Sequence, residues 1–487
     1  MSFNLQVFIL YSFPLLVALF ILKSYFYSLK PHKNLPPSPP KLPLIGNLHQ
    51  LRSGAHRILQ SMAQTYGPLM LLHFSTVPVI VASSVDAARE IMKTHDIIFS
   101  NRPFLNIPDR ITYGSKDIAF AQYGEYWREV KSISVLHLLS NKRVQSYQQV
   151  REDEVAHMIR KIQGVNEAVV NLSEFLVLLT NNVICRVALG RTYKVKNMLD
   201  KIKKLSGRSI GSFIPSLVWV DRFRGLHREA DELAKEIDEF YEDVIEEHVN
   251  KKEFGVEGQD LIDILLEIQK DNSTGFRLER YMIKAIMVDI LGAGTDTTST
   301  TLEWAICELL RNPSAMKELQ QEARKIGQGR SMIPEDDIDK MPYLKAVLKE
   351  ALRLHAPIPL LVPRESTKDA KVLGYDIPSG TQVLINAWAI ARDPSIWEEP
   401  EEFKPERFLN NSIDYKGFHF ELIPFGAGRR GCPGVRFAMT INELALANLV
   451  YKFEFALPGE ESLDMTESDG VTIHKKFPIL VIPTPCE

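Results

Sequence analysis

The sequence predicts a mainly α-helical protein with small β-sheets, an α+β fold built around one large domain. From about residue 55 to 355, apolar residues recur mostly at helical spacing, as in 128–139, 144–162 and 229–249. Strand-like stretches are short and few, near 69–74, 78–82, 382–387 and 479–482. Because helices and strands do not alternate regularly, a doubly wound parallel sheet is not expected.

Composition excludes several classes of protein. Of the 487 residues, 45% are hydrophobic and 24% are charged, as in an ordinary globular chain rather than a disordered or fibrous one. Lys and Arg number 58 and Asp and Glu 61, so no chain-wide basic field for nucleic acid exists. The four cysteines lie far apart without a CxxC pair, which argues against a disulfide framework or a structural zinc site.

The N-terminus predicts a membrane anchor. Residues 5–22 form an uncharged, mostly apolar run of 18 residues, just long enough to cross a bilayer as a helix. Lys23, Lys30 and Lys33 follow it, which places the rest of the chain on the cytoplasmic side. The alternative is a cleaved secretory signal, but no basic residue precedes the run and no cleavage site is clear. We therefore divide the chain into an anchor with its basic flank (1–30), a proline-rich hinge (31–45) and a main domain (46–487).

The segment 425–434, which reads FGAGRRGCPG, admits two interpretations. Gly426, Gly428 and Gly431 satisfy GxGxxG, the dinucleotide-binding pattern, which would make the chain a nucleotide-dependent dehydrogenase. Only about fifty residues follow, too few for the rest of a typical doubly wound domain. The other interpretation centres on Cys432 as a thiolate at the start of a helix, stabilised by free backbone N–H groups.

The second interpretation explains more of the loop. Pro433 suits a first helical turn, the glycines let backbone pass close to a flat ligand, and Arg430 supplies a cation for an anionic group on it. A planar, anionic cofactor held by a thiolate is a haem with an axial cysteine. Cys185 and Cys307 sit in apolar helical patterns and are expected to be ordinary buried residues.

A long helix is expected from about 278 to 311, stopped by Asn312 and Pro313. Its apolar middle contains the segment 292–298, GAGTDTT, whose glycines and acid break local rules for a buried helix. The hydroxyl of Thr297 is placed to bond the carbonyl of Ala293 and open the helix beside bound oxygen, and Asp296 is placed to relay protons. The alternative is a core helix whose Ser and Thr residues bond their own backbone.

The cysteine segment resembles the haem loop of cytochrome P-450 monooxygenases, F-x-x-G-x-R-x-C-x-G, at Phe425, Gly428, Arg430, Cys432 and Gly434. The segment around Ala293, Asp296 and Thr297 resembles the oxygen-activation motif of the same family. The resemblance implies haem b, with the sulfur of Cys432 as the axial ligand of the iron.

Further segments resemble other motifs of that family. Glu350 and Arg353 resemble its ExxR pair, and Arg407 in PERF resembles the residue that completes a buried structural Arg–Glu–Arg network. The segment 127–131 resembles the WxxxR motif that holds a haem propionate. Trp127 is present, but Lys131 replaces the arginine and loses its bidentate fork, so Arg128 is a second candidate. Arg364 resembles a further propionate contact.

The resemblance covers essentially the whole chain and is strongest to the plant microsomal type of specialised metabolism. It implies an endoplasmic reticulum membrane protein, single-pass, which uses O2 and takes electrons from NADPH through a separate reductase, with cytochrome b5 as an alternative donor. The implied substrate is a small hydrophobic metabolite of the coumarin, phenolic or terpenoid class. Family resemblance places its contacts at Phe104, Phe120, Val288, Leu291, Leu360, Leu361, Val362, Val471 and Thr472.

Two other haem functions stay open at this point. A haem-thiolate isomerase or lyase acting on peroxides would need neither O2 nor a reductase, although the intact acid and alcohol on the long helix argue against it. A non-catalytic haem-binding protein would not need that acid and alcohol at all.

Overall fold

The computed structural model describes residues 34–51, 53–165, 168–211, 214, 217–250, 259–271, 276–459 and 463–486. The expected anchor at 1–30 and the first part of the hinge lie outside the described residues. Within them the chain is mainly helical with small sheets, which confirms the predicted class.

The α-helices are α2 (Ala55–Tyr66), α3 (Val85–Arg89), α4 (Asn106–Ile111), α5 (Glu125–Ile133), α6 (Asn141–Ser146), α7 (Gln148–Gln163), α8 (Leu172–Leu189), α9 (Lys196–Ser206), α10 (Val218–Phe223), α11 (Leu226–Asn250), α12 (Leu261–Lys270), α13 (Arg280–Arg311), α14 (Pro313–Gly327), α15 (Pro342–Leu354), α16 (Ala387–Ile390) and α17 (Val435–Lys452). Short 3₁₀ or π turns are η1 (Leu48–Gln50), η2 (Glu90–Thr94), η3 (Ser134–Leu138), η6 (Glu335–Lys340), η7 (Pro405–Phe408) and η8 (Gly428–Arg430).

The strands are β1 (Leu69–Phe74), β2 (Val77–Ala82), β3 (Val170–Asn171), β4 (Arg364–Glu365), β5 (Ala370–Val372), β6 (Tyr375–Ile377), β7 (Gln382–Ile385), β8 (Phe453–Ala456) and β9 (Leu480–Pro485). They form a four-stranded sheet in the order β1-β2-β7-β4, a three-stranded sheet β3-β9-β8 and the hairpin β5-β6. In the first sheet β2 and β7 run parallel, with Val79 opposite Gln382, and this pairing ties the N-terminal part of the domain to its C-terminal half.

Two predicted helices are interrupted. The stretch 144–162 breaks at Tyr147 between α6 and α7, and 128–139 continues from α5 into the π turn η3. Apolar spacing alone carries no signal for such breaks, because residues on both sides keep facing the same core. The four predicted strand regions correspond to β1, β2, β7 and β9.

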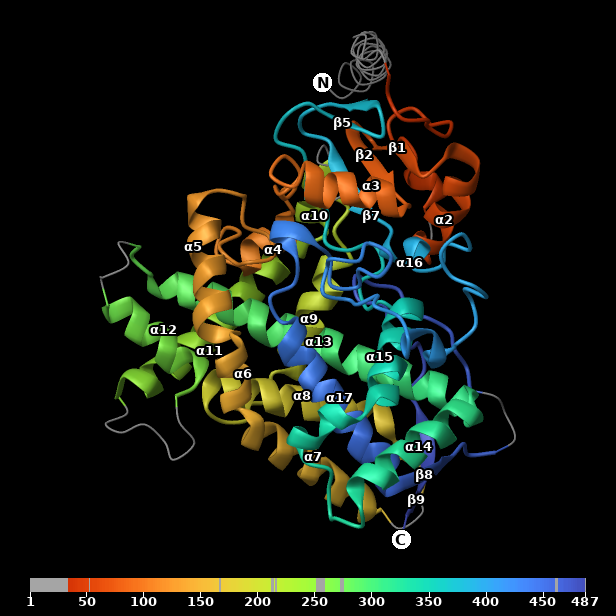
Figure 1. Cartoon of the computed structure of the whole chain (residues 1–487). Coiled ribbons are helices and arrows are strands. Elements are labelled where there is room, and N and C mark those ends of the chain that lie inside the picture. The colour runs from red at the N-terminus through yellow and green to blue at the C-terminus, as the bar shows by residue number, and fades with distance from the viewer. Residues whose placement is uncertain are drawn as a thin grey trace, which may run out of the picture.

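The helix α13 passes through the middle of the domain and packs against α8, α15 and α17 (Figure 1). Its 32 residues give a length of roughly 48 Å at 1.5 Å per residue. A helix covered on several sides is apolar all round, which is why its sequence lacks a polar stripe. Among the described helices α8 alone is long and apolar enough to cross a membrane, but most of it is buried in this core.

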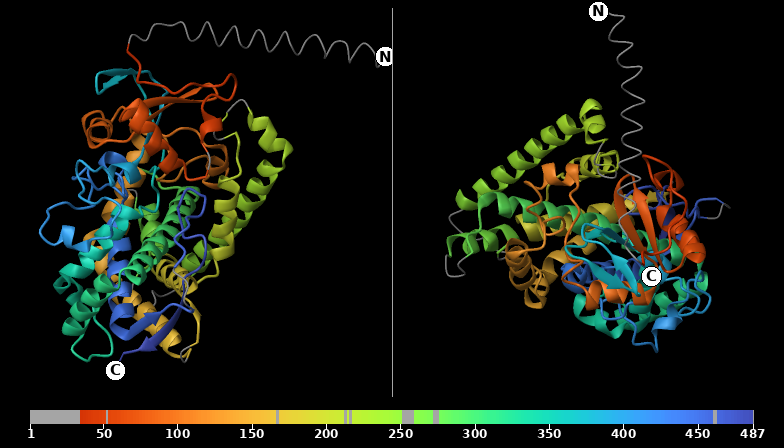
Figure 2. Two further views of the ribbon diagram at one scale, coloured as in Figure 1. Left: turned by 90° about the vertical axis from the view of Figure 1, so that its right-hand side faces the viewer. Right: turned by 90° about the horizontal axis from the view of Figure 1, so that it is seen from above.

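The two larger sheets lie at opposite ends of the molecule (Figure 2, left). The sheet with β1 and β2 lies where the chain enters from the N-terminus, and β8 and β9 lie near the C-terminus. Between them lie α13, which carries the segment 292–298, and α17, which begins directly after the cysteine loop; the two helices pack against each other.

Candidate active site

The cysteine loop leads directly into α17. The backbone N–H of Cys432 donates to the carbonyl of Phe425 at 3.0 Å, which closes the loop. The sulfur accepts a hydrogen bond from the N–H of Gly434 at 3.3 Å, just before α17 begins at Val435. Among the described residues no strand lies between β7 and this loop, so GxGxxG is not part of a dinucleotide-binding β-α unit here.

The side chain of Cys432 combines accessibility with close surroundings of protein. Its side chain is accessible, and yet burial among the surrounding atoms raises the pKa of the thiol. The thiol is therefore accessible to a ligand and at the same time partly desolvated by the protein. The N–H of Gly434 and the charge of Lys131 oppose the effect of burial and lower the pKa of the thiol, so both stabilise a thiolate.

Three buried arginines from separate segments gather beside the loop: Arg102, Arg364 on β4, and Arg430. Burial, with a smaller contribution from Arg364, lowers the pKa of Arg430 to about 9, although Asp117 opposes the shift. Burial likewise lowers the pKa of Arg102, and Arg430 and Arg364 add to that effect. These cations repel one another in a poorly solvated place, which an anionic group among them would relieve.

The partners of these arginines support this interpretation. Within the described part of the chain, Arg102 and Arg430 donate only to backbone carbonyls; Arg430 reaches those of Ser100, Ile118 and Ala121. Arg364 donates to the carbonyl of Ala427 at 2.7 Å and pairs with Asp96 at 3.3 Å. No local pattern in the sequence marks Arg102, because its part in the cluster depends on contacts with residues far along the chain.

Of the basic residues near Trp127, the structure brings only Lys131 to the cysteine loop. Its Nζ donates to the carbonyl of Gly431 at 2.8 Å, whereas Arg128 is exposed on α5. Trp127 donates its indole N–H to the carbonyl of Ile118 and stacks under the Arg430 guanidinium, 4.2 Å from the ring centre. Burial lowers the pKa of Lys131 to about 8; Cys432 opposes the shift and the neighbouring arginines add to it.

These residues fit a haem. The loop presents an accessible thiol, a crowded cluster of cations gathers at the same loop, and small residues shape the surrounding backbone. A Cβ on Gly428 would lie 2.3 Å from the carbonyl oxygen of Met92, so only glycine allows this close approach. Cys432 would ligate the iron, and Arg102, Arg364, Arg430 and Lys131 would face the propionates.

The oxygen-side motif lies in the middle of α13, as expected. The hydroxyl of Thr297 donates to the carbonyl of Ala293 at 2.8 Å. Ala293 is exposed, and Gly292, Gly294 and Thr297 beside it on the helix are only partly buried, so this short stretch of a central helix is left accessible. Gly294 leaves room for α8, because a Cβ there would lie 2.8 Å from Cδ1 of Ile184 and that side chain would have to shift.

Asp296 is held by two basic side chains that the sequence argument missed. Lys203 on α9 donates to its Oδ1, and Nε2 of His474 lies 3.0 Å from the same oxygen. Burial opposes ionisation, but His474 and Lys203 outweigh it and lower the pKa of Asp296 to about 2. A carboxylate with this pKa is ionised at neutral pH.

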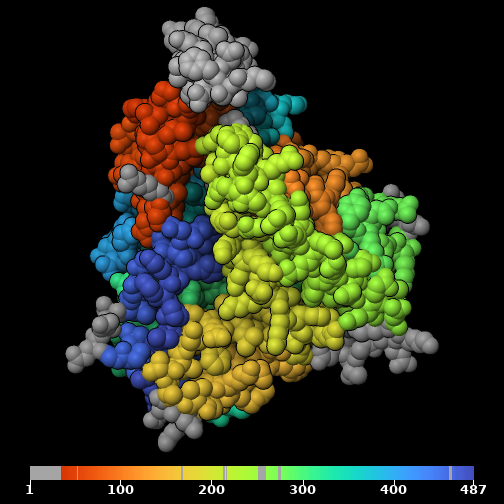
Figure 3. Space-filling view, turned by 180° about the vertical axis from the view of Figure 1, so that it is seen from behind, coloured from red at the N-terminus to blue at the C-terminus, as the bar shows by residue number. Residues whose placement is uncertain are grey.

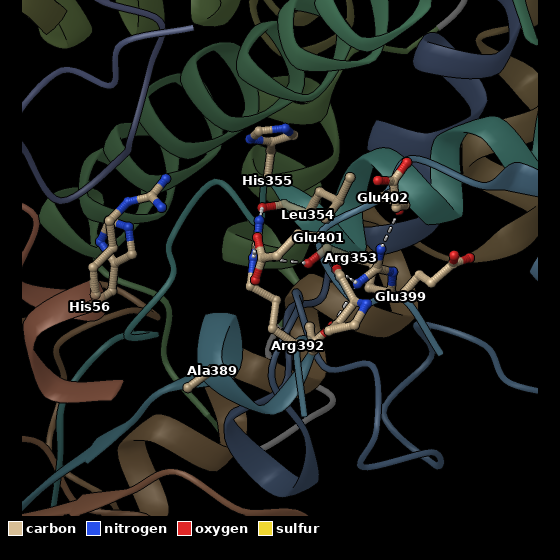
Figure 4. Close-up of polar contacts among 12 residues, drawn as sticks. His56, Arg353, Leu354, His355, Ala389, Arg392, Glu399, Glu401 and Glu402 are labelled. Atoms are coloured by element: carbon tan, nitrogen blue, oxygen red, sulfur yellow. Dashed lines mark hydrogen bonds and ion pairs between the residues drawn. The ribbon is translucent and has the colours of Figure 1, made fainter. Parts of the chain in front are cut away.

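The structural network forms around Glu350, which is fully buried. Its carboxylate accepts hydrogen bonds from Nε of Arg353 at 2.7 Å and from Nε of Arg407 at 3.0 Å. It also accepts one from the backbone N–H of Lys404. Arg353 also donates to the carbonyl of Glu402 (Figure 4). Every side of the buried carboxylate is therefore hydrogen-bonded, the condition under which such a network stabilises a fold.

The predicted substrate residues differ in their exposure. Leu291 is fully buried and lines no open space, while Phe104 and Val471 are 66% and 64% exposed. The segment before β4 lies against the cation cluster, since the carbonyl of Val362 accepts from Arg102. The rest are partly buried: Phe120, Val288, Leu360, Leu361 and Thr472. Their contact with a substrate stays a prediction.

Comparisons with known proteins give the same family over nearly the whole chain. The family model for cytochrome P-450 matches residues 36–481. The chain is 54% identical to a 3-beta-hydroxylase of Tanacetum parthenium, with 93% of each chain covered, and 53% identical to a psoralen synthase of Ammi majus, with 98% of each covered. A solved zebra fish cytochrome P-450 with abiraterone matches with a TM-score of 0.74 and 29% identity, covering 89% of this chain and all of that one. The chain belongs to the cytochrome P-450 family.

Proposed function

We propose that this protein is a haem-dependent monooxygenase that oxidises a small hydrophobic plant metabolite, with electrons from NADPH through a separate reductase. The observation that carries the proposal is that an accessible cysteine sulfur lies just before α17 and an acid and an alcohol lie on α13, two helices that pack against each other. When bound, the haem activates O2, so that one atom enters the substrate and the other leaves as water.

The chain's own residues have separate tasks in this reaction. Cys432 holds the iron, and the N–H of Gly434 with Lys131 stabilises its thiolate. Arg102, Arg364, Arg430 and Lys131 hold the propionates. Thr297 keeps its hydroxyl on the carbonyl of Ala293 at this turn of α13, and Asp296 beside it carries protons inward.

The names of the relatives support a substrate class. The similarity to a 3-beta-hydroxylase supports hydroxylation, and the similarity to a psoralen synthase supports a coumarin-like substrate, since psoralen is a coumarin. The substrate contacts predicted from the sequence are mostly apolar, which suits a small hydrophobic ligand. A panel of coumarins, phenolics and terpenoids, screened by their binding spectra, tests this class.

The exposed apolar residues support attachment to the endoplasmic reticulum membrane. Leu42, Leu44, Trp219 and Phe223 are all exposed, Phe223 by 87%. The segments that carry them, residues 34–50 and α10, lie at the end of the molecule where the chain leaves toward its N-terminus (Figures 2 and 3). A membrane at this end would cover these side chains and receive the anchor predicted at 1–30.

Electron transfer calls for a partner with an acidic face. Arg128, Arg429 and Arg436 are exposed on or near the cysteine loop and α5, where a reductase would approach the thiolate side of the haem. Reversing all three charges should lower reductase-supported turnover at low salt. Reversing Arg228, an exposed arginine of α11, is the matched control. Unchanged turnover in the triple variant would refute this docking site.

The decisive experiment uses the full-length protein in detergent. The reduced protein with carbon monoxide should absorb near 450 nm, the expected band of a thiolate-ligated haem, and NADPH with reductase should support product formation. A folded protein without that band would refute haem–thiolate ligation, and a purified sample without haem would revive the dehydrogenase interpretation. Turnover of a peroxide without NADPH would instead favour an isomerase or lyase.

A further inference from the structure

The carboxylate of Asp296 is reached from the surface through two side chains of different kinds. Lys203 on α9 is 44% exposed and His474 26% exposed, whereas Asp296 itself is only 11% exposed. The two residues come from segments 271 positions apart in the chain (474 − 203), and both contact Oδ1. Either residue is placed to exchange a proton with Asp296, and the contacts around His474 distinguish the two.

The ring of His474 is fixed from its other side by α13. Its Nδ1 lies 2.8 Å from the hydroxyl of Thr300, and that hydroxyl donates its one hydrogen to the carbonyl of Asp296, also at 2.8 Å. The hydroxyl therefore accepts from Nδ1–H. If the ring were neutral, Nε2 would then turn a lone pair toward the carboxylate. In the imidazolium Nε2 instead carries a hydrogen and faces Oδ1 as one half of an ion pair at 3.0 Å, without an aligned hydrogen bond.

The backbone around His474 is also anchored to α13. The indole N–H of Trp304 donates to the carbonyl of Ile473 at 2.9 Å, and the N–H of Lys475 donates to Glu303 at 3.3 Å. The carbonyl of His474 accepts the N–H of Ser468 at 2.8 Å. The ring thus keeps its place while the side chain of Lys203 extends from a separate helix.

We propose that His474 is a positioning and proton-supplying residue for Asp296, that Thr300 fixes its ring, and that Lys203 only holds the carboxylate. In the step itself the Nε2–H bond of the imidazolium breaks and an O–H bond forms on Oδ1 of Asp296. The neutral imidazole keeps its hydrogen on Nδ1 and regains the other from water through its exposed edge. Because the pKa of Asp296 is about 2, the acid holds this proton only in transit and passes it inward toward the oxygen side.

The surrounding charges are consistent with this assignment. The charged groups near the ring are Asp296 and Glu303 on α13, Lys203 on α9 and Lys475 in its own segment. Lys475 turns its ammonium to the carbonyl of Phe477 at 2.7 Å, and Glu303 accepts the hydroxyl of Ser173. This leaves His474 as the group best placed to pass a proton to Asp296. The inference rests on the monooxygenase function proposed above.

The test compares His474→Gln with Lys203→Gln in the full-length, haem-loaded protein with reductase. Glutamine keeps a hydrogen-bond donor but cannot pass on a proton. His474→Gln should lower product formed per NADPH by about tenfold or more, raise peroxide release and enlarge the solvent deuterium isotope effect on kcat. KM and the substrate-induced spectrum should not change. Lys203→Gln should leave the isotope effect as in the wild type.

A second measurement does not depend on activity. Because His474 and Asp296 are in contact, the thermal unfolding midpoints of His474→Gln, Asp296→Asn and the double variant should be non-additive. The double variant should unfold no lower than Asp296→Asn alone. If His474→Gln does not retain haem, Thr300→Val, which only frees the ring, is used instead; it should show a smaller loss of coupling and the same change in isotope effect.

The outcomes separate the two proposals. Equal losses in the His474 and Lys203 variants would overturn the proton-supplying role, since both residues would then only hold the carboxylate. Wild-type coupling in His474→Gln, or additive midpoints, would also overturn it. If the wild-type protein lacks the 450 nm band or NADPH-dependent turnover, the monooxygenase proposal itself fails.

Discussion

Replacing Gly428 by alanine should destabilise the cysteine loop more than any other single methyl added there. The backbone of Gly428 has φ +68°, a left-handed conformation that costs an L-residue about 1–2 kcal/mol. The added Cβ would also lie 2.3 Å from the carbonyl oxygen of Met92 and 2.7 Å from Oδ1 of Asp96. Overpacking of this kind costs about 1–3 kcal/mol, so the total is about 2–5 kcal/mol.

Gly426 is the matched control within the same loop. It has φ +69°, but a Cβ there meets nothing closer than a methyl of Leu361 at 3.8 Å. Gly426→Ala should therefore cost only the conformational part, about 1–2 kcal/mol. The difference between the two variants isolates the contact with Met92 and Asp96.

The assay is urea unfolding of the full-length protein in detergent, followed by far-ultraviolet circular dichroism, with the 450 nm band as a measure of haem retention. Gly428→Ala should unfold at lower urea than Gly426→Ala and retain less haem, because Asp96 also pairs with Arg364. Equal midpoints for the two variants would show that the loop shifts away from Met92 without cost, and would refute the close approach as the reason for glycine.

Three other changes have defined outcomes. Thr297→Ala removes the hydroxyl that donates to the carbonyl of Ala293. It should lower the product formed per NADPH by about tenfold and raise the release of peroxide. Unchanged turnover would favour a protein that does not activate oxygen. Glu350→Gln should cost about 3–5 kcal/mol of unfolding free energy, measured by urea, against under about 1 kcal/mol for the exposed control Glu401→Gln. Burial raises the pKa of Glu443 from 4.5 to about 7, so between these pH values the folded state keeps a proton that the unfolded state has lost. The free energy of unfolding therefore falls by up to about 3 kcal/mol as the pH rises from 4.5 through 7. Glu443→Gln should abolish this fall in unfolding midpoints; parallel pH curves for variant and wild type would contradict it.

Local sequence signals were sufficient for the parts of the site that neighbours in the chain define. The end of α13 at Arg311 follows from Asn312 and Pro313, and the bond from Thr297 to Ala293 follows from helical spacing alone. The loop around Cys432 is also local, because Gly434 supplies its N–H from two residues away. In each case backbone geometry fixes the partner once the helix is placed.

Tertiary contacts define the parts that sequence reasoning missed. Arg102 joins the cation cluster through the carbonyl of Val362, which is 260 residues away. Lys203 lies 93 residues before Asp296, and His474 lies 178 residues after it (474 − 296). Each is one basic residue among many, and no spacing rule distinguishes a lysine that reaches a buried acid from one that faces water.

The two sides of the haem site are therefore held by different segments of the chain, so substitutions on each side should have different effects on the enzyme. The thiolate side depends on the loop and on buried cations, so its perturbation should show in the 450 nm band. The oxygen side depends on α9 and on the segment that carries His474, both of which contact Asp296 from the outside of α13. Substitutions in these two segments can alter coupling of electrons to product without changing haem ligation. If changes at Lys203 or His474 always reduced the 450 nm band in parallel with coupling, the two sides would be one structural unit, and the separation argued from their contacts would be wrong.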